Sequence, residues 1–238
     1  MKEFFYERIG EEVCRERRTN GLEVCVVLKP GYAKKYAFVS TRYGCMDTRF
    51  RLYCKWLDTP AGIAHYLEHK MFDTREGNAL QELAKNGAEP NAFTANAMTA
   101  YYFDSTEHFE ENLRILLSFV SIPYFTDESV AKEQGIIGQE IRMVEDDPEN
   151  QVFYGMMETL YVHNPIKVSI AGTVESIAEI TAETLYACHA AFYNPGNMTL
   201  CVAGNVDPRR VCEIAREVLP KEGLRDIPRD YGGEEPEQ

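Results

Sequence analysis

The sequence predicts an α+β fold in which a mixed, largely antiparallel sheet packs against a layer of helices. Strand-like segments lie toward both ends of the chain and helical segments gather between them, unlike the regular alternation expected of a parallel doubly wound sheet. The 238 residues are 45% hydrophobic and 26% charged, an ordinary composition for a globular protein with a sizeable core.

The expected strands are segments rich in β-branched and aromatic residues and bounded by Gly or Pro. Near the N-terminus, residues 22–30 (LEVCVVLKP) and 36–44 (YAFVSTRYG) fit this pattern, and the short polar link between them predicts a hairpin. Residues 91–106 predict two further strands, joined around residues 95–97, and residues 198–207 predict the last strand.

The expected helices are segments whose apolar residues recur every three or four positions. They comprise residues 62–72, 76–87, 107–120, 127–147, 149–162, 180–193 and 208–220. Boundary signals support three of them, because Asn86 and Gly87 end the second, Thr181 can cap the sixth and Pro208 is the first residue of the last.

Residues 1–220 are expected to form one domain, and residues 221–238 a linker or tail. The tail sequence, KEGLRDIPRDYGGEEPEQ, is polar, is interrupted by Gly and Pro, and has no hydrophobic periodicity.

Charge and cysteine content restrict the partners and the compartment. The 25 basic and 38 acidic residues give a net charge of −13, and without a basic stripe this argues against nucleic acid as a partner. The start lacks the apolar core of a signal peptide, and the most apolar run, 115–125, is broken by Pro123 and far shorter than the ~20 residues of a membrane span. We expect a cytoplasmic protein that does not enter a membrane, whose seven cysteines, without any C-x-x-C pair, are reduced thiols.

The segment AHYLEHKMFD (64–73) carries the clearest chemical signal. Helical spacing places His65, Glu68 and His69 on one face. Two imidazoles at this spacing can bind one zinc ion, and the carboxylate between them stands where a general base would act on a metal-activated water. The same string also arises by chance on surface helices, but the absence of Asp, Glu, Lys or Arg from residues 59–67 favours a metal site.

Two histidines leave a catalytic zinc site one protein ligand short. Glu133 and Glu140 lie seven residues apart, about two helical turns, and so share a face of the helix expected at 127–147. One could bind the metal while the other hydrogen-bonds a ligand histidine. Such a pair is also typical of a solvated helix face, and this helix carries further acids at 145–147.

Five motifs resemble, in this order, the pitrilysin/insulinase family of zinc peptidases, which share the H-x-x-E-H sequence. The resemblance covers residues 15–220, and its motifs are AGIAHYLEHKMF, NAFTANAMTAYYF, EQGIIGQEIRMVEDDPE, AGTVESIAEIT and FYNPGNMTLCVAGNVD. It implies a half-domain of that peptidase type, in which His65, His69 and Glu140 bind one zinc ion per chain. It also implies that Glu68 is the general base and that Glu133 orients the site.

The resemblance further implies that Asn91, Ala92, Phe93 and Thr94 belong to an edge strand that pairs with an extended peptide. Backbone pairing demands little sequence specificity, so unfolded or extended peptides are the expected substrates of a zinc endopeptidase. Considered without the resemblance, Asn91 and Thr94 are also compatible with ordinary turn chemistry.

Members of this family are usually built from two homologous halves, and this sequence resembles only a first half. We therefore expect a second half or partner subunit, which tail residues 221–238 would lead to; a homodimer is a further possibility. Two other functions stay open, a non-catalytic partner or scaffold subunit and a structural zinc domain. A structural site would be closed by four protein ligands, which three ligands and an interposed Glu68 argue against.

Overall fold

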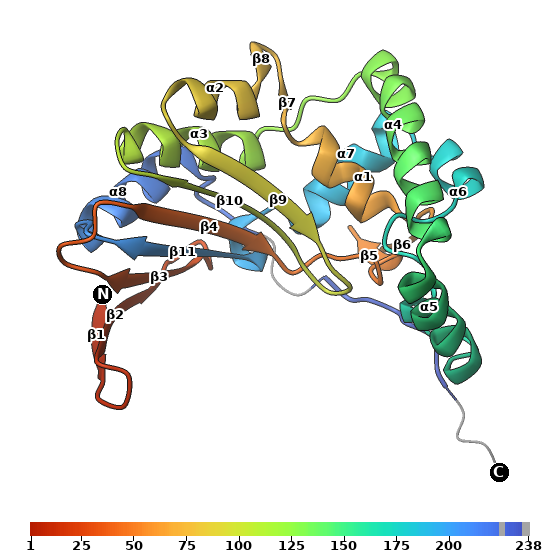
Figure 1. The fold of residues 1–238 in the computed structure, drawn as a ribbon, viewed down its shortest axis with the longest axis horizontal. Helices are drawn as coiled ribbons and strands as arrows, with labels where there is room; N and C mark the ends of the chain where they lie inside the picture. Colours follow the sequence, from red (N-terminus) through yellow and green to blue (C-terminus); the bar gives the residue numbers. More distant parts are fainter. Residues whose placement is uncertain (224–226, 235–238) are drawn as a thin grey trace.

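The computed structural model describes residues 1–223 and 227–234, and its centre is a seven-stranded sheet (Figure 1). The strand order is β1-β2-β3-β11-β4-β10-β9. The strands are β1 Lys2–Tyr6, β2 Glu11–Arg17, β3 Glu23–Leu28, β4 Lys35–Thr41, β9 Glu89–Thr94, β10 Thr99–Ser105 and β11 Met198–Gly204. Among these seven described strands, only β3 and β11 pair in parallel, so the predicted mixed, largely antiparallel sheet is confirmed.

The helices lie on one face of this sheet and at one end of it (Figure 1). They are α1 Ile63–Lys70, α2 Ala79–Lys85, α3 Phe109–Ser121, α4 Asp127–Asp146, α5 Pro148–Leu160, α6 Val174–Ala178, α7 Ala182–Phe192 and α8 Pro208–Val218. Two short 3-10 helices, η1 Pro165–Lys167 and η2 Pro195–Asn197, accompany them. Thr181 caps α7 and Pro208 opens α8, as predicted. The N-terminal strands β1 and β2, helix α6 and the small hairpins β5–β6 (Arg49–Leu52, Lys55–Asp58) and β7–β8 (Asp73–Thr74, Gly77–Asn78) were not predicted.

The predicted hairpin of residues 22–30 and 36–44 is wrong. Both segments form strands, but β11 lies between β3 and β4, and the hairpin partner of β3 is β2. The central strands alternate buried and half-buried residues, and that alternation fixes which face points to the helices without specifying the neighbouring strand.

The core forms where the inner face of the sheet meets the helices. Val24, Val39 and Leu200 contribute one side chain from each of three adjacent strands, and all are almost fully buried. Ile63 and Leu67 of α1 belong to the same buried cluster, which fixes α1 near the middle of the molecule. Within residues 1–223 and 227–234, no helix combines the length and the apolar character needed to cross a membrane.

Candidate metal centre

Close contacts at the start and in the middle of α1 fix the position of the helix that carries the histidines. Gly62 precedes the helix with a φ of 85°, and a Cβ at this position would lie 2.4 Å from the carbonyl oxygen of Ala171. Glycine is the residue that tolerates both the left-handed conformation and this contact. One turn later the Tyr66 hydroxyl donates a hydrogen bond to the carbonyl of Val130 in α4, so α1 and α4 are held side by side.

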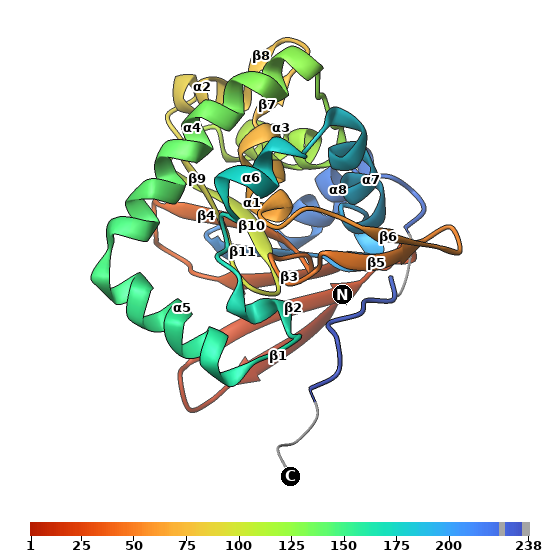
Figure 2. The same ribbon diagram turned by 90° about the vertical axis from the view of Figure 1, so that its right-hand side faces the viewer.

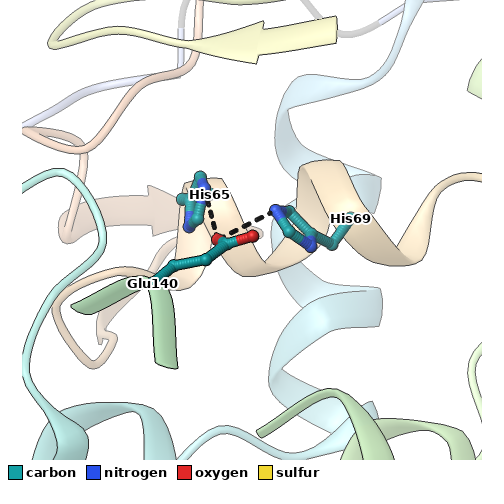
Figure 3. A group of neighbouring side chains, drawn as sticks. All are labelled: His65, His69 and Glu140. Atoms are coloured by element: carbon teal, nitrogen blue, oxygen red, sulfur yellow. Dashed lines mark ion pairs between the residues drawn. The ribbon is translucent and has the colours of Figure 1, made fainter. Parts of the chain in front are cut away.

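The face of α1 turned toward α4 carries His65 and His69, and Glu140 of α4 reaches between them (Figure 3). The Glu140 Oε2 atom lies 3.7 Å from His65 Nε2 and 3.5 Å from His69 Nε2. One ligating atom from each of the three residues falls within 4.8 Å of the other two. The structure thus brings together the two histidines and Glu140. Of the two glutamates considered as third ligand, Glu140 is the one that lies between them.

Two imidazole nitrogens and a carboxylate oxygen form a donor set that zinc accepts, with a fourth position left for water or substrate. Burial, and to a lesser degree His69, lowers the pKa of His65 to about 4. His65 is therefore neutral near pH 7 and can offer a nitrogen lone pair. Its other ring nitrogen, Nδ1, is buried and has no hydrogen-bond partner among the described residues. These residues fit a zinc ion.

Glu133 lies on the other side of the His69 ring. Its Oε1 atom is 3.1 Å from His69 Nδ1, and this hydrogen bond is the main reason why the pKa of Glu133 is lowered. Burial alone would lower the pKa of His69, but the hydrogen bond to Glu133 and the charges of Glu140 and Glu68 outweigh it and raise that pKa. An ionised Glu133 can only accept, so Nδ1 donates and Nε2 is the nitrogen left for a metal.

Sequence reasoning missed Lys70, the residue after His69. Its side chain is 2% exposed, and its ammonium group is paired with Asp73 and lies 3.6 Å from Glu133 Oε2. A buried ammonium needs such partners, and here it adds a positive charge that holds Glu133 ionised. The i, i+3 spacing of Lys70 and Asp73 was the only available signal.

Glu68 is 8% exposed and lines the same cavity as His65, His69 and Glu140. Burial raises the pKa of its carboxyl group, and a hydrogen bond from Thr94 partly offsets that effect. The Thr94 hydroxyl donates to Glu68 Oε2 at 2.8 Å. A raised pKa brings a carboxylate closer to the value that suits a general base near neutral pH.

A cavity of about 470 Å³ connects the residues of α1 to strand β9. Besides His65, Glu68, His69 and Glu140, its lining includes Ala92, Phe93, Thr94, Val144, Asn150, Tyr154, Ser169, Ile170 and Ala171. Of the four residues predicted to bind substrate, Asn91 alone is not part of this lining. Residues 150–171 were missed because no sequence signal links α5 and its following loop to the histidines.

Strand β9 lies at the edge of the sheet, where β10 is its neighbour. The backbone amide of Ala92 donates to the side chain of Asn91 at 2.8 Å and not to β10. This amide therefore faces the outer edge of β9, next to the cavity.

Two family models match the sequence. Residues 57–174 match the model described as insulinase (peptidase family M16), and residues 179–237 match the one described as peptidase M16 inactive domain. The second match includes the segment expected to be a tail, of which residues 224–226 and 235–238 lie outside the described residues.

Curated relatives agree with the family models. The uncharacterized zinc protease YmfH of Bacillus subtilis is 44% identical over 230 residues, which are 96% of this chain and 54% of the relative. An uncharacterized zinc protease of Streptomyces coelicolor is 32% identical over 173 residues, covering 70% and 38%. The chain thus spans about half the length, or less, of the curated relatives that it matches.

Solved structures extend the agreement to the fold. An M16-like peptidase from Alicyclobacillus acidocaldarius superposes with a TM-score of 0.87 at 39% identity, over 93% of this chain and 53% of that chain. Pitrilysin superposes with a TM-score of 0.77 at 18% identity, over 94% and 25%, and shows the half-domain fold alone. Sequence models, relatives and fold lead to one conclusion: the chain belongs to the insulinase-type peptidase family M16.

Proposed function

We propose that this chain is the metal-binding half of a zinc endopeptidase that hydrolyses unfolded or extended peptides, with Glu68 as general base. One observation carries the proposal. The buried Glu68 carboxylate shares a cavity with the ligating atoms of His65, His69 and Glu140, and residues of the edge strand β9 line the same cavity. A base, a metal position and a backbone that can hold a peptide thus meet in one place.

Each residue has a distinct role in this proposal. His65, His69 and Glu140 would hold one zinc ion, which supplies Lewis-acid chemistry when bound. Glu68 accepts the proton of the attacking water and returns it to the leaving amine. Thr94 fixes the direction of the Glu68 carboxylate through its hydrogen bond. Glu133 keeps the His69 ring turned so that Nε2 faces the metal position.

The edge strand β9 supports extended peptides as substrates. A peptide that pairs with the outer edge of β9 would lie along Ala92, Phe93 and Thr94, beside Glu68. To reach the amide of Ala92 it must first displace the side chain of Asn91. Asn91 therefore occupies one backbone donor of the open edge when no peptide is bound, and an occupied donor is less available for unwanted strand pairing.

Residues 1–220 would then form the metal-binding domain and residues 221–238 the connection to a second half. The chain spans 54% of YmfH, so such a half would be provided by the same polypeptide, by a homologous partner subunit or, as a third arrangement, by a second copy of this chain.

Replacing Glu68 with glutamine tests the proposal, because glutamine keeps the shape of the side chain but cannot accept the proton. We expect one zinc ion per chain in Glu68→Gln, and peptide hydrolysis by the assembled enzyme that is lower by about two orders of magnitude or more. Glu82→Gln, an exposed glutamate on α2, is the matched control. Wild-type turnover in Glu68→Gln would assign water activation to another residue. Zinc binding without cleavage in the assembled wild type would favour a non-catalytic partner subunit.

A further inference from the structure

Residues 227–234, here called the strap, run past the β5–β6 hairpin toward the end of α5 (Figures 1 and 2). The amide of Arg51 donates to the carbonyl of Pro228 at 2.9 Å, and the amide of Asp230 donates to the carbonyl of Arg49 at 3.0 Å. Arg49 also pairs with Asp230, at 3.1 Å. The strap thus adds a short bridge to the hairpin β5–β6.

The middle of the strap packs on a buried carboxylate. Asp47 is 2% exposed, and Arg229 Nε lies 2.7 Å from its Oδ1 atom. The Tyr231 hydroxyl donates to the same oxygen at 2.8 Å, and the amide of Gly44 donates to the other oxygen at 2.8 Å. Burial raises the pKa of Asp47, so its ionised form depends on these three partners. The strap therefore holds the loop of residues 43–47.

That loop in turn holds the turn between β9 and β10. The amides of Cys45 and Met46 donate to the carbonyls of Ala95 and Asn96, at 3.1 and 3.0 Å. A Cβ on Gly44 would lie 2.4 Å from the Ala95 oxygen, so the two backbones touch. Residue 94, directly before this turn, is the threonine that hydrogen-bonds Glu68.

A second path joins the same two regions through aromatic packing. The guanidinium of Arg229 lies 5.1 Å from the centre of the Phe192 ring, which stacks on Tyr43 at 4.2 Å. The carbonyl of Tyr43 accepts a hydrogen bond from Thr99 at 2.9 Å, and the Thr99 hydroxyl is 3.4 Å from that of Thr94.

The far end of the strap contacts the loop that follows α5 and leads to another part of the cavity lining. The Glu234 carboxylate accepts hydrogen bonds from the amides of Val162, His163 and Asn164, at 3.0, 2.6 and 2.6 Å. This loop follows α5 and leads to residues 169–171, which line the cavity. The strap thus contacts both the loop of residues 43–47, which holds the β9–β10 turn, and the loop that leads to residues 169–171.

From these contacts we propose that Arg229 and Tyr231 are positioning residues. They hold Asp47 and the loop of residues 43–47, which in turn sets the position of strand β9. Through Thr94 of this strand they also set the position of the Glu68 carboxylate. The inference rests on the proposed function as far as catalysis is concerned. The mechanical part, a coupling between the strap and the β9–β10 turn, does not depend on it. A residue of this kind touches neither substrate nor metal, but it determines how well the base is held before the reaction.

Hydrogen exchange of the zinc-loaded 238-residue chain tests the coupling without any activity assay. In Tyr231→Phe, which removes one hydroxyl group, we expect the amides of Cys45 and Met46 and those of residues 94–97 to exchange at least three-fold faster, with zinc content unchanged. Arg229→Gln should act in the same direction and more strongly. The matched controls are Tyr53→Phe and Arg8→Gln. Tyr53 is exposed in the turn of the β5–β6 hairpin that the strap contacts, and Arg8 is exposed in the β1–β2 turn.

Unchanged exchange at residues 45–46 and 94–97 in both strap variants would overturn the proposal. So would an equal acceleration throughout the sheet, including β3, because that result indicates only a general loss of stability. In the assembled peptidase, Tyr231→Phe should lower kcat at least three-fold, a larger factor than any change in KM for an unfolded peptide. If the assembled wild type cleaves no peptide, the proposed function fails, while the exchange experiment still decides whether the strap positions β9.

Discussion

At the scale of single residues, the sequence predicted the cluster of residues that could hold a metal better than it predicted their surroundings. Helical spacing placed His65, Glu68 and His69 on one face, and the structure has them there. Spacing alone left Glu133 and Glu140 as equal candidates for third ligand, since residues seven apart share a helix face. Their difference depends on how α4 crosses α1, which brings Glu140 to the Nε2 atoms and Glu133 to Nδ1 of His69. That crossing is a tertiary property and has no local signal.

Glu133 should therefore affect zinc affinity without binding the ion. In Glu133→Gln the hydrogen bond to His69 loses its charged partner, and Lys70 loses one of its two carboxylates. We expect zinc to bind about 10- to 100-fold more weakly, as measured by competition with a fluorescent chelator. Glu128→Gln, on an exposed position of the same helix, should bind zinc as the wild type does. Wild-type affinity in Glu133→Gln would reject the orienting role.

His189 should make the metal-free fold less stable in mild acid. Its ring is buried, and burial lowers its pKa to about 4, below the ordinary value of 6.5. Between pH 6.5 and 4 the unfolded chain therefore binds a proton that the folded chain does not, and stability falls as the pH falls. In His189→Gln, whose amide can replace the bond to Val120, the slope of unfolding free energy against pH should be flatter by up to about 1.4 kcal/mol per pH unit. An unchanged slope in chemical denaturation would contradict this.

At the scale of elements, amphipathic periodicity located the long helices, whereas strand pairing was not predictable. Helices α3, α4 and α7 lie close to the expected ranges, because each buries one face and has a recognisable beginning or end. Strand β2 was missed because five of its seven residues are charged, and β1 because its five residues are all exposed and show no polar–apolar alternation. The insertion of β11 between β3 and β4 depends on contacts between residues about 160 positions apart, such as Val39 and Leu200.

Strand β9 gives the prediction that belongs to this scale. If peptides add to its outer edge, the amide of Ala92 should exchange its bond to Asn91 for one to the peptide. We expect slower hydrogen exchange at residues 91–94 when the zinc-loaded Glu68→Gln chain is saturated with an extended peptide, because the peptide is then bound but not cleaved. The opposite edge strand, β1, should exchange at the same rate with and without peptide. Protection on β1 or on helices alone would show that peptides bind elsewhere.

At the scale of the whole molecule, one surface is more apolar than an isolated domain requires. Helix α5 buries none of its residues, and Val152 and Leu160 are 73% and 62% exposed. Large exposed apolar side chains that cluster on one element are typical of a surface that another folded unit covers. Because this chain spans only about half of YmfH, a second half is the partner that we expect there. Helix α5 also lines the cavity beside the histidines, through Asn150 and Tyr154.

The chain on its own should consequently bind zinc but cleave peptides poorly. All three proposed ligands and the base lie between residues 65 and 140, so the metal site can assemble from this sequence alone. Clamping a peptide in the geometry for attack can contribute several kcal/mol to catalysis, and a second half facing α5 and the cavity would supply that clamp. Adding this half, as one polypeptide or as a separate chain, should restore turnover, whereas adding it to Glu68→Gln should not. Equal peptidase activity of the 238-residue chain and the reconstituted enzyme would show that the cavity needs no second half.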